Sequence, residues 1–270
     1  MTTLFEEKKG PNTFSTSVQQ FLESGKGPSA HATASDLAST VTSSDDVDNA
    51  LWELWDAFFN AVARSPTPHT AHLTLLSAFA ALPPSRPGSQ ESSRHAQSDG
   101  SLRWADLPGF SAQWRDVHDI LESRRGEGGF PAEAFLRFCS FSAVYLRDTR
   151  GAGQVHPINV IYAARGTLER DAPKTETLSL DVNVASVWIR DGGQTLWDSD
   201  HDSLRQHWAT TLDHPTDRWP DGRGLTRERW AMWQERLKTL SVDEGELDKD
   251  TKAVAGEAAN VIGALLEEHH

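Results

Sequence analysis

One stretch, residues 130–149, is apolar on nearly every side of a helix, and it limits the fold more than any other part of the chain. Its sequence is FPAEAFLRFCSFSAVYLRDT. Pro131 suits the first helical position, because its ring fixes φ and it has no N–H to leave unpaired. The apolar positions that follow are Phe135, Leu136, Phe138, Cys139, Phe141, Val144, Tyr145 and Leu146. A helix this apolar is buried inside a domain, so other helices must cover it.

A second helix is predicted directly after the first, over HPINVIYAARGTLER, residues 156–170. The helical period places Pro157, Ile161, Ala164 and Leu168 on one face, and His156, Asn159, Ala163 and Gly166, with Tyr162 beside them, on another. The turn between the helices, RDTRGAG, brings charge to a helix start, where unpaired N–H groups favour anions. We expect any functional site at this turn and on the His156 side of the second helix. A buried polar seam that ties helices together is the alternative.

The remaining apolar segments also have helical spacing. In LTRERWAMWQERLKTL the stripe consists of Trp230, Trp233, Leu237 and Leu240. The segment LSLDVNVASVWIRDGGQTLW contains β-branched residues but keeps helical spacing, and its Gly192 and Gly193 either end the helix or let another helix cross closely. No segment alternates with period two between hairpin turns. We therefore predict an all-α fold, a single orthogonal bundle of about eight to ten helices around the buried central helix pair.

Composition shifts suggest where the folded part of the chain lies. Residues 1–42 are rich in Ser, Thr, Gly, Pro and Ala, and we predict a mobile N-terminal segment with at most one short helix near Phe14 and Val18. Within it, GKGPSAHATAS is predicted to be a connector. Residues 43–266 are predicted to form a single helical domain. Its residues 83–101 have no apolar side chain larger than Pro or Ala and are predicted to be a loop or disordered insertion.

Charge and cysteine content exclude several classes of protein. Most of the net charge of −13 lies in the flanks, because residues 1–50 hold 7 acidic and 3 basic groups and residues 241–270 hold 8 and 2. Extended binding of duplex nucleic acid is not expected, since it needs many basic contacts to phosphates. The single cysteine, Cys139, excludes an internal disulfide. With no secretory signal and no long apolar run, we expect a cytoplasmic protein without a membrane partner. The sequence indicates no oligomeric state.

Short motifs give no recognisable cofactor or metal site. DDVDN at 45–49 resembles an aspartate-rich magnesium motif, but first-turn acids that cap a helix explain it. DSDHDS at 198–203 lacks the glycine of a calcium loop. His69 and His72 lie three apart with no intervening glutamate, and exposed polar residues at a helix start are the commoner case. We expect no metal and no cofactor.

Six polar residues around the central pair make up the candidate site. His156 and Tyr162 are the candidate catalytic groups, because either could move a proton. The candidate substrate-binding residues are Arg147, Asp148, Asn159 and Arg165. The structural alternative makes Arg147 and Asp148 an ion pair and His156 a helix cap.

Three blocks of the chain resemble, in order, a fungal family of intracellular helical proteins known only as a domain of unknown function. The blocks are LRDTRGAGQVHPINVIYAARGTLER, VWIRDGGQTLW and GRGLTRERWAMWQERLKTL. The resemblance covers about residues 45–266. It implies an intracellular helical protein of filamentous fungi and does not imply a reaction.

The chain is also similar to small fungal proteins that include arginine-containing cyclodipeptide synthases, which couple arginine to a second amino acid from aminoacyl-tRNAs. This resemblance implies an enzyme of secondary metabolism with a small-molecule or aminoacyl-tRNA substrate. Asp148 would then bind the arginine guanidinium, and His156 or Tyr162 would assist attack of the amine on the ester. The alternative is a non-enzymatic helical interaction protein or a small-metabolite-binding protein.

Overall fold

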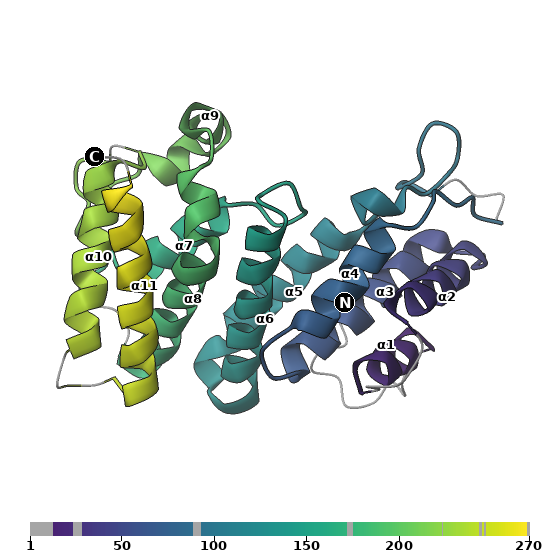
Figure 1. Cartoon of the computed structure of the whole chain (residues 1–270), viewed down its shortest axis with the longest axis horizontal. Coiled ribbons are helices and arrows are strands. Elements are labelled where there is room, and N and C mark those ends of the chain that lie inside the picture. The colour runs from purple at the N-terminus through teal and green to yellow at the C-terminus, as the bar shows by residue number, and fades with distance from the viewer. Residues whose placement is uncertain are drawn as a thin grey trace. The chain divides into compact units, whose positions relative to one another are not determined.

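The structure is a computed structural model that describes residues 13–23, 29–88, 93–171, 175–222, 224–242, 245 and 247–268. Over these residues the chain forms eleven α-helices and three short 3-10 helices, with no strand (Figure 1). An isolated bridge pairs Ser85 with Leu102. The predicted all-α class is confirmed, with one helix more than the expected eight to ten.

The contacts between residues divide the chain into two compact units, residues 1–138 and 139–270. The first unit contains α1 (Thr13–Glu23), α2 (Ala30–Thr42), α3 (Val47–Arg64), α4 (Thr70–Ala80), η1 (Trp104–Asp106), α5 (Phe110–Arg124) and η2 (Arg125–Glu127). The second contains α7 (Ile158–Thr167), η3 (Thr175–Thr177), α8 (Leu178–Trp197), α9 (His201–Leu212), α10 (Arg227–Val242) and α11 (Lys249–Glu267). The boundary falls inside α6 (Gly129–Asp148). A single domain over 43–266 stays a prediction. The two units are defined by their internal contacts, which do not show whether either unit folds independently.

The core of the first unit surrounds Trp55 on α3. Its ring meets Phe110 at a centroid distance of 5.2 Å, Phe79 at 5.4 Å and Phe58 at 6.0 Å, all edge to face. The indole N–H donates to the Pro108 carbonyl at 2.7 Å, so the buried ring leaves no polar atom unpaired. Asp46 begins the helix as its N-cap, accepting the N–H of Asn49 at 2.9 Å. The capping interpretation of the DDVDN motif is therefore confirmed.

Helix α2 occupies residues that the sequence assigned to a connector. The Ser29 side chain caps it by accepting the N–H of Ala32, and it buries Ala34, Leu37 and Val41 while packing against α3 and α4. The connector prediction is wrong for these residues. Its alternating Ala, Ser and Thr side chains give a weak helical pattern, and the packing against other helices stabilises it. The short helix predicted near Phe14 is present as α1.

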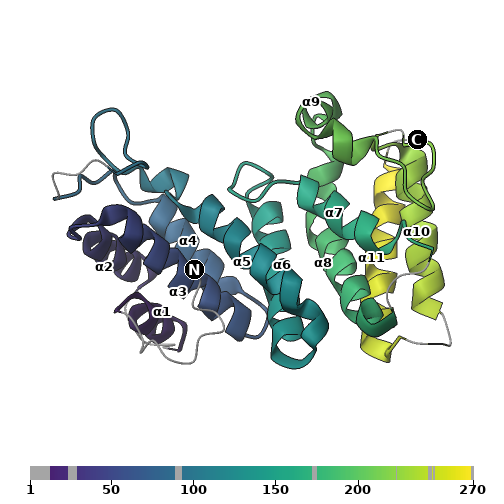
Figure 2. The same ribbon diagram turned by 180° about the vertical axis from the view of Figure 1, so that it is seen from behind.

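In the second unit, α8 packs against both α7 and α11, and α10 lies beside α11 (Figures 1 and 2). The helix prediction for α8 is confirmed, and the helix continues through both glycines. A Cβ at Gly192 would lie 3.0 Å from Leu146 and 3.1 Å from Val160, so glycine permits a close approach here. Of the two roles considered for the glycines, close helix crossing is the one found at Gly192.

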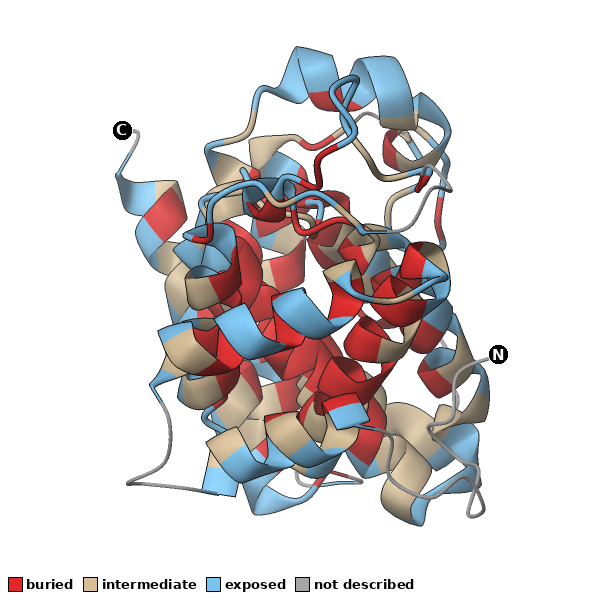
Figure 3. Ribbon diagram, turned by 90° about the vertical axis from the view of Figure 1, so that its right-hand side faces the viewer, coloured by how far each residue is buried: buried red, intermediate tan, exposed pale blue. Residues whose placement is uncertain are grey.

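Helix α6 is buried around most of its circumference, as its composition predicted. Its buried residues include Ala134, Phe135, Phe138, Cys139, Phe141, Ala143, Tyr145 and Leu146. By contrast α9 is largely exposed and buries only Leu204 and Leu212 (Figure 3). None of the helices in the described part of the chain combines the length and hydrophobicity needed to cross a membrane.

Candidate functional site

Helix α7 has the two faces that its sequence predicted. Ile161, Ala164 and Leu168 are buried, whereas His156, just before the helix, and Tyr162 are exposed. Tyr162 is 45% exposed, which is unusual for a large aromatic residue in the described part of the chain. The polar face therefore lies at the surface of the second unit and is not a buried seam.

The His156 imidazole accepts a hydrogen bond from the backbone at the start of α7. Its Nδ1 accepts the N–H of Ile158 at 3.1 Å, and its carbonyl accepts the side-chain amide of Asn159 at 2.9 Å. The pKa of His156 lies below its usual value. Partial burial is the larger cause, and the neighbouring His207 is the smaller one. The neutral ring carries one proton, and since Nδ1 is an acceptor, that proton lies on Nε2.

Helix α9 supplies the opposite side of this face. The Trp208 ring lies 5.4 Å from the His156 ring and 6.3 Å from the Tyr162 ring, to which it is nearly perpendicular. The Tyr162 hydroxyl lies 3.2 Å from the Thr211 hydroxyl. Trp208 has non-helical backbone angles, φ −127° and ψ 23°, at a kink inside α9. His156, Asn159, Tyr162, Trp208 and Thr211 are called the α7–α9 face below.

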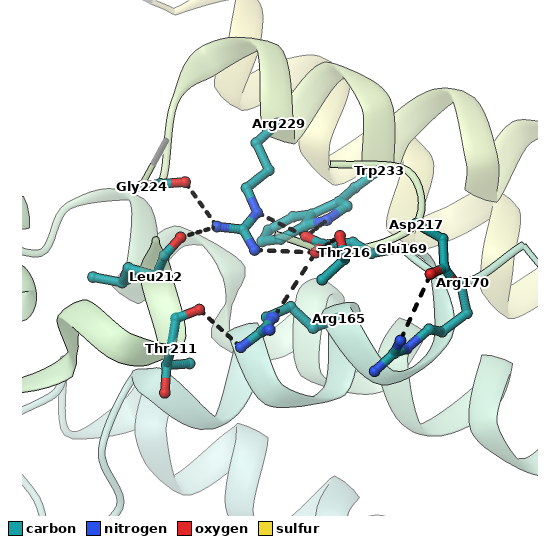
Figure 4. A network of polar contacts seen from close by, with 10 residues as sticks. All are labelled: Arg165, Glu169, Arg170, Thr211, Leu212, Thr216, Asp217, Gly224, Arg229 and Trp233. Carbon is teal, nitrogen blue, oxygen red and sulfur yellow. Dashed lines mark hydrogen bonds and ion pairs between the residues drawn. The ribbon is translucent and has the colours of Figure 1, made fainter. Parts of the chain in front are cut away.

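Arg165 links this face to a buried network. Its Nη1 donates to the Thr211 carbonyl at 2.8 Å, and its Nε lies 3.9 Å from a Glu169 oxygen (Figure 4). Burial lowers the pKa of Arg165, and the Glu169 carboxylate opposes that effect. With its guanidinium turned toward the protein, Arg165 holds α7 to α9 in this structure.

The network centres on a fully buried ion pair between Glu169 and Arg229 (Figure 4). Glu169 Oε1 accepts from Arg229 Nε at 2.7 Å and from Trp233 Nε1 at 2.8 Å. Its Oε2 accepts from Arg229 Nη2 at 3.0 Å and from the Thr216 hydroxyl at 2.8 Å. Arg229 Nη1 donates to the carbonyls of Leu212 and Gly224. Through these contacts α10 binds both the end of α7 and the segment that connects α9 to α10.

Sequence reasoning did not identify Glu169 or Arg229. A signal was present for Arg229, because it lies four residues before Trp233 and so shares a helix face with part of the apolar stripe. A charged residue within such a stripe indicates a buried partner. Glu169 lies next to the buried Leu168 at the end of α7 and carried no comparable signal.

Arg147 and Asp148 belong to a different environment. Arg147 donates to Asp148 at 2.9 Å and to Asp191 of α8 at 2.9 Å, and Asp191 also pairs with Arg190. Three of the six predicted residues thus belong to the α7–α9 face, and Arg165 lies beside it. Arg147 instead contacts α8, and Asp148 pairs with Arg147. The Arg147–Asp148 pair has the geometry of the structural alternative considered from the sequence.

The RDTRGAG turn uses its backbone N–H groups internally. Those of Arg150, Gly151 and Ala152 donate to the carbonyls of Arg147, Leu146 and Thr149. Arg150 and Gly151 have positive φ angles of 50° and 76°, which turn the chain sharply out of α6. The anion site expected at the helix start after this turn gains no support, because the N–H groups of Ile158, Asn159 and Val160 also have acceptors.

The predicted exposure of His69 and His72 is wrong. Both are buried, their rings lie 5.3 Å apart, and His69 Nε2 contacts the Arg137 carbonyl at 3.0 Å. Burial lowers the pKa of each histidine from 6.5 to about 4. They start α4 facing the core, where Phe58 packs against His72.

A family model described as a protein of unknown function, DUF3632, matches residues 55–237, which is more than half of the chain. The chain belongs to this family. The DUF3632 match runs from α3 into α10 and includes all six predicted site residues together with Glu169 and Arg229. Searches of curated proteins and of solved structures return no match.

Proposed function

We propose that this DUF3632 protein binds a small planar molecule on the α7–α9 face. The observation that carries the proposal is the position of Trp208, whose ring lies within 6.3 Å of both His156 and Tyr162. Two of these three rings are exposed and Trp208 is half-buried. Aromatic side chains that converge from two helices offer ring faces and edges on which a planar ligand can stack.

The hydrogen bonding of His156 favours binding over proton transfer. A general base needs an unprotonated nitrogen directed at its substrate, but the Nδ1 lone pair is used by the Ile158 N–H. The remaining Nε2–H is a donor. We infer that the ligand presents a hydrogen-bond acceptor, such as a carbonyl or carboxylate oxygen, to this group.

The charges around the face favour a neutral or anionic ligand. His207 lies close enough to His156 to lower its pKa, and Arg165 adds a cation below the face. Two acids that follow α7 and α9 in the sequence are paired with arginines: Asp213 with Arg205, and Glu169 with Arg229 and Arg165. A cationic ligand would therefore meet unfavourable electrostatics, unlike a carboxylate.

The test is a thermal-shift screen of planar metabolites that carry an acceptor, including aromatic carboxylates, nucleobases and indole carboxylates. A ligand that binds the folded protein raises its melting temperature. We expect such a shift for the unmodified chain, its loss in Trp208→Ala, and its retention in Tyr162→Phe, which keeps the ring. Trp52→Ala, at a half-buried tryptophan of the first unit, is the matched control and should keep the shift. Equal shifts in Trp208→Ala and the parent would contradict the proposal.

A more specific proposal follows from the resemblance to fungal arginine-containing cyclodipeptide synthases, enzymes of secondary metabolism that would act in the cytoplasm. In that case Asp148 would bind the substrate guanidinium. Its carboxylate already pairs with Arg147 at 2.9 Å, so a substrate arginine would have to displace that side chain. Expression in a host with charged tRNAs, followed by mass spectrometry, should then yield new cyclo-arginyl dipeptides. Their absence would contradict this second proposal and leave the first intact.

A further inference from the structure

Three side chains near the end of α5, in the first unit, form a compact set of metal-ligand types. His118, Asp119 and Glu122 each present one ligand atom, and the three atoms lie within 4.8 Å of one another. Imidazole nitrogen and carboxylate oxygen are common ligands of Zn²⁺ and related ions. We propose that this set, called the α5 triad below, binds a divalent transition metal, with Zn²⁺ as the defining probe.

The distances within the α5 triad are close to those of a coordinated metal. His118 Nδ1 lies 3.4 Å from Asp119 Oδ1 and 3.9 Å from Glu122 Oε2. Two ligands of a tetrahedral zinc ion with bonds of about 2.0–2.1 Å lie roughly 3.4 Å apart. The first pair already has this spacing, and a small rotation of Glu122 would bring in the third ligand. The fourth position would then be occupied by water.

Aromatic packing orients His118, and this distinguishes the α5 triad from a chance cluster of surface acids. The imidazole stacks on Trp114 with centroids 5.1 Å apart, and it meets Phe135 at 5.7 Å and Phe138 at 6.3 Å. Its side chain is only 20% exposed. Because the ring is already held with Nδ1 beside the carboxylates, metal binding costs less conformational entropy than at a mobile surface histidine.

Two features compete with the metal. A protonated His118 could pair with the two carboxylates without any ion. In addition, Arg125 places Nη1 3.8 Å from Glu122 Oε1, where it would repel a bound cation. The second feature gives a prediction that an ion pair alone does not: removing the Arg125 charge should strengthen metal binding.

From the sequence no metal is expected, and His69 and His72 are the only histidine pair with a ligand-like spacing that was considered. The structure buries that pair and instead brings together three groups at positions i, i+1 and i+4 of α5. Such a spacing is common on exposed helices, and only the packing of Trp114 and Phe138 around His118 distinguishes this case.

The test is a titration of the full chain with Zn²⁺ by calorimetry and with Co²⁺ by visible absorption. His269→Asn and His270→Asn are introduced first into the parent chain, so that the carboxy-terminal histidines do not contribute. We expect one bound ion per chain. His118→Phe, which keeps a stacked ring, and the isosteric Asp119→Asn and Glu122→Gln should each weaken binding by about tenfold or more. Arg125→Gln should tighten it by roughly two- to fivefold, the range of a screened surface pair.

The outcomes separate the proposal from its alternatives. Absence of Zn²⁺ binding by the parent, or binding that survives all three ligand substitutions, would overturn it. Weaker binding in Arg125→Gln would also count against it. Circular dichroism checks that each variant is folded, and if His118→Phe fails this check, the two exposed carboxylate variants decide. Mg²⁺ and Ca²⁺ serve as the chemical control, because these ions prefer sites made of oxygen ligands.

Discussion

Glu169 is a buried carboxylate that accepts four hydrogen bonds from neighbouring side chains. It is fully buried, and both of its oxygens accept hydrogen bonds from Arg229 and from a second donor. Burying two charges is costly, and their attraction offsets the cost only when the remaining hydrogen-bonding groups are satisfied. Here they are satisfied, which makes the loss of one partner more damaging than the loss of both.

Glu169→Gln should therefore destabilise the protein by about 3–5 kcal/mol, because it leaves the Arg229 charge buried without its counterion. Urea unfolding followed by circular dichroism measures this change. The double variant Glu169→Leu with Arg229→Met should recover most of the loss. Asp217→Asn, which removes one partner of the exposed Arg170–Asp217 pair, is the control and should cost less than about 1 kcal/mol. A double variant that is less stable than Glu169→Gln would contradict this account.

The buried pair His69 and His72 should make the first unit sensitive to mild acid. Each has a pKa of about 4 when folded against 6.5 when unfolded, so between these values the unfolded chain binds more protons. The free energy of unfolding should stay constant above pH 6.5 and fall as the pH is lowered toward 4. The loss is on the order of 1–3 kcal/mol per histidine.

The measurement is the difference in urea midpoint between pH 7 and pH 5. His72→Leu should reduce this difference, whatever its effect on absolute stability, since one titrating group is gone. His201→Gln, at an exposed histidine on α9, should leave the difference unchanged. If His72→Leu keeps the full pH dependence, the acid sensitivity arises elsewhere.

Among the helices, the strength of the apolar pattern decided what could be predicted. The stripe Trp230, Trp233, Leu237 and Leu240 is buried in α10, because large side chains at helical spacing have few other ways to leave water. In α2 the buried side chains are mostly small, so the same period was hard to detect. The pairing of Glu169 with Arg229 joins residues far apart in the sequence, and helical periodicity carries no information about it.

Gly192 and Gly193 in α8 give a matched test of helix crossing. A Cβ at Gly192 would lie 3.0 and 3.1 Å from two side-chain atoms, which is closer than van der Waals contact. At Gly193 the nearest atom would be 3.8 Å away, which is an ordinary contact. Gly192→Ala should destabilise by about 1–3 kcal/mol through overpacking. Gly193→Ala should be neutral or stabilise by up to about 1 kcal/mol through helix propensity. Thermal unfolding of both variants checks the contrast, and equal effects would refute it.

At the scale of the whole molecule, the negative net charge disfavours binding of polyanions such as DNA. With a formal net charge of −13, the chain should not bind duplex DNA even at about 50 mM salt, because such binding depends on neutralising many phosphates. Gel retardation of a short duplex measures this directly. Retention that disappears with added salt would show a local basic surface that the net charge conceals.

The candidate site was only partly predictable, because it depends on contacts between helices that are far apart in the sequence. Helical spacing correctly placed His156, Asn159 and Tyr162 on one exposed face of α7. It could not show that Trp208 of α9 lies beside His156 and Tyr162, since that contact depends on how the chain returns after α8. Nor could it show that Arg147 would donate to Asp191 of α8.

The Cys139 thiol can be used to measure local opening of the native structure. The thiol is the sole sulfhydryl group and is 1% exposed on α6, so a labelling reagent reaches it only when the packing around that helix opens. The rate of thiol modification under native conditions therefore measures how fast the packing around α6 opens, with no engineered probe. Reagent concentration series would then separate the opening rate from the opening equilibrium.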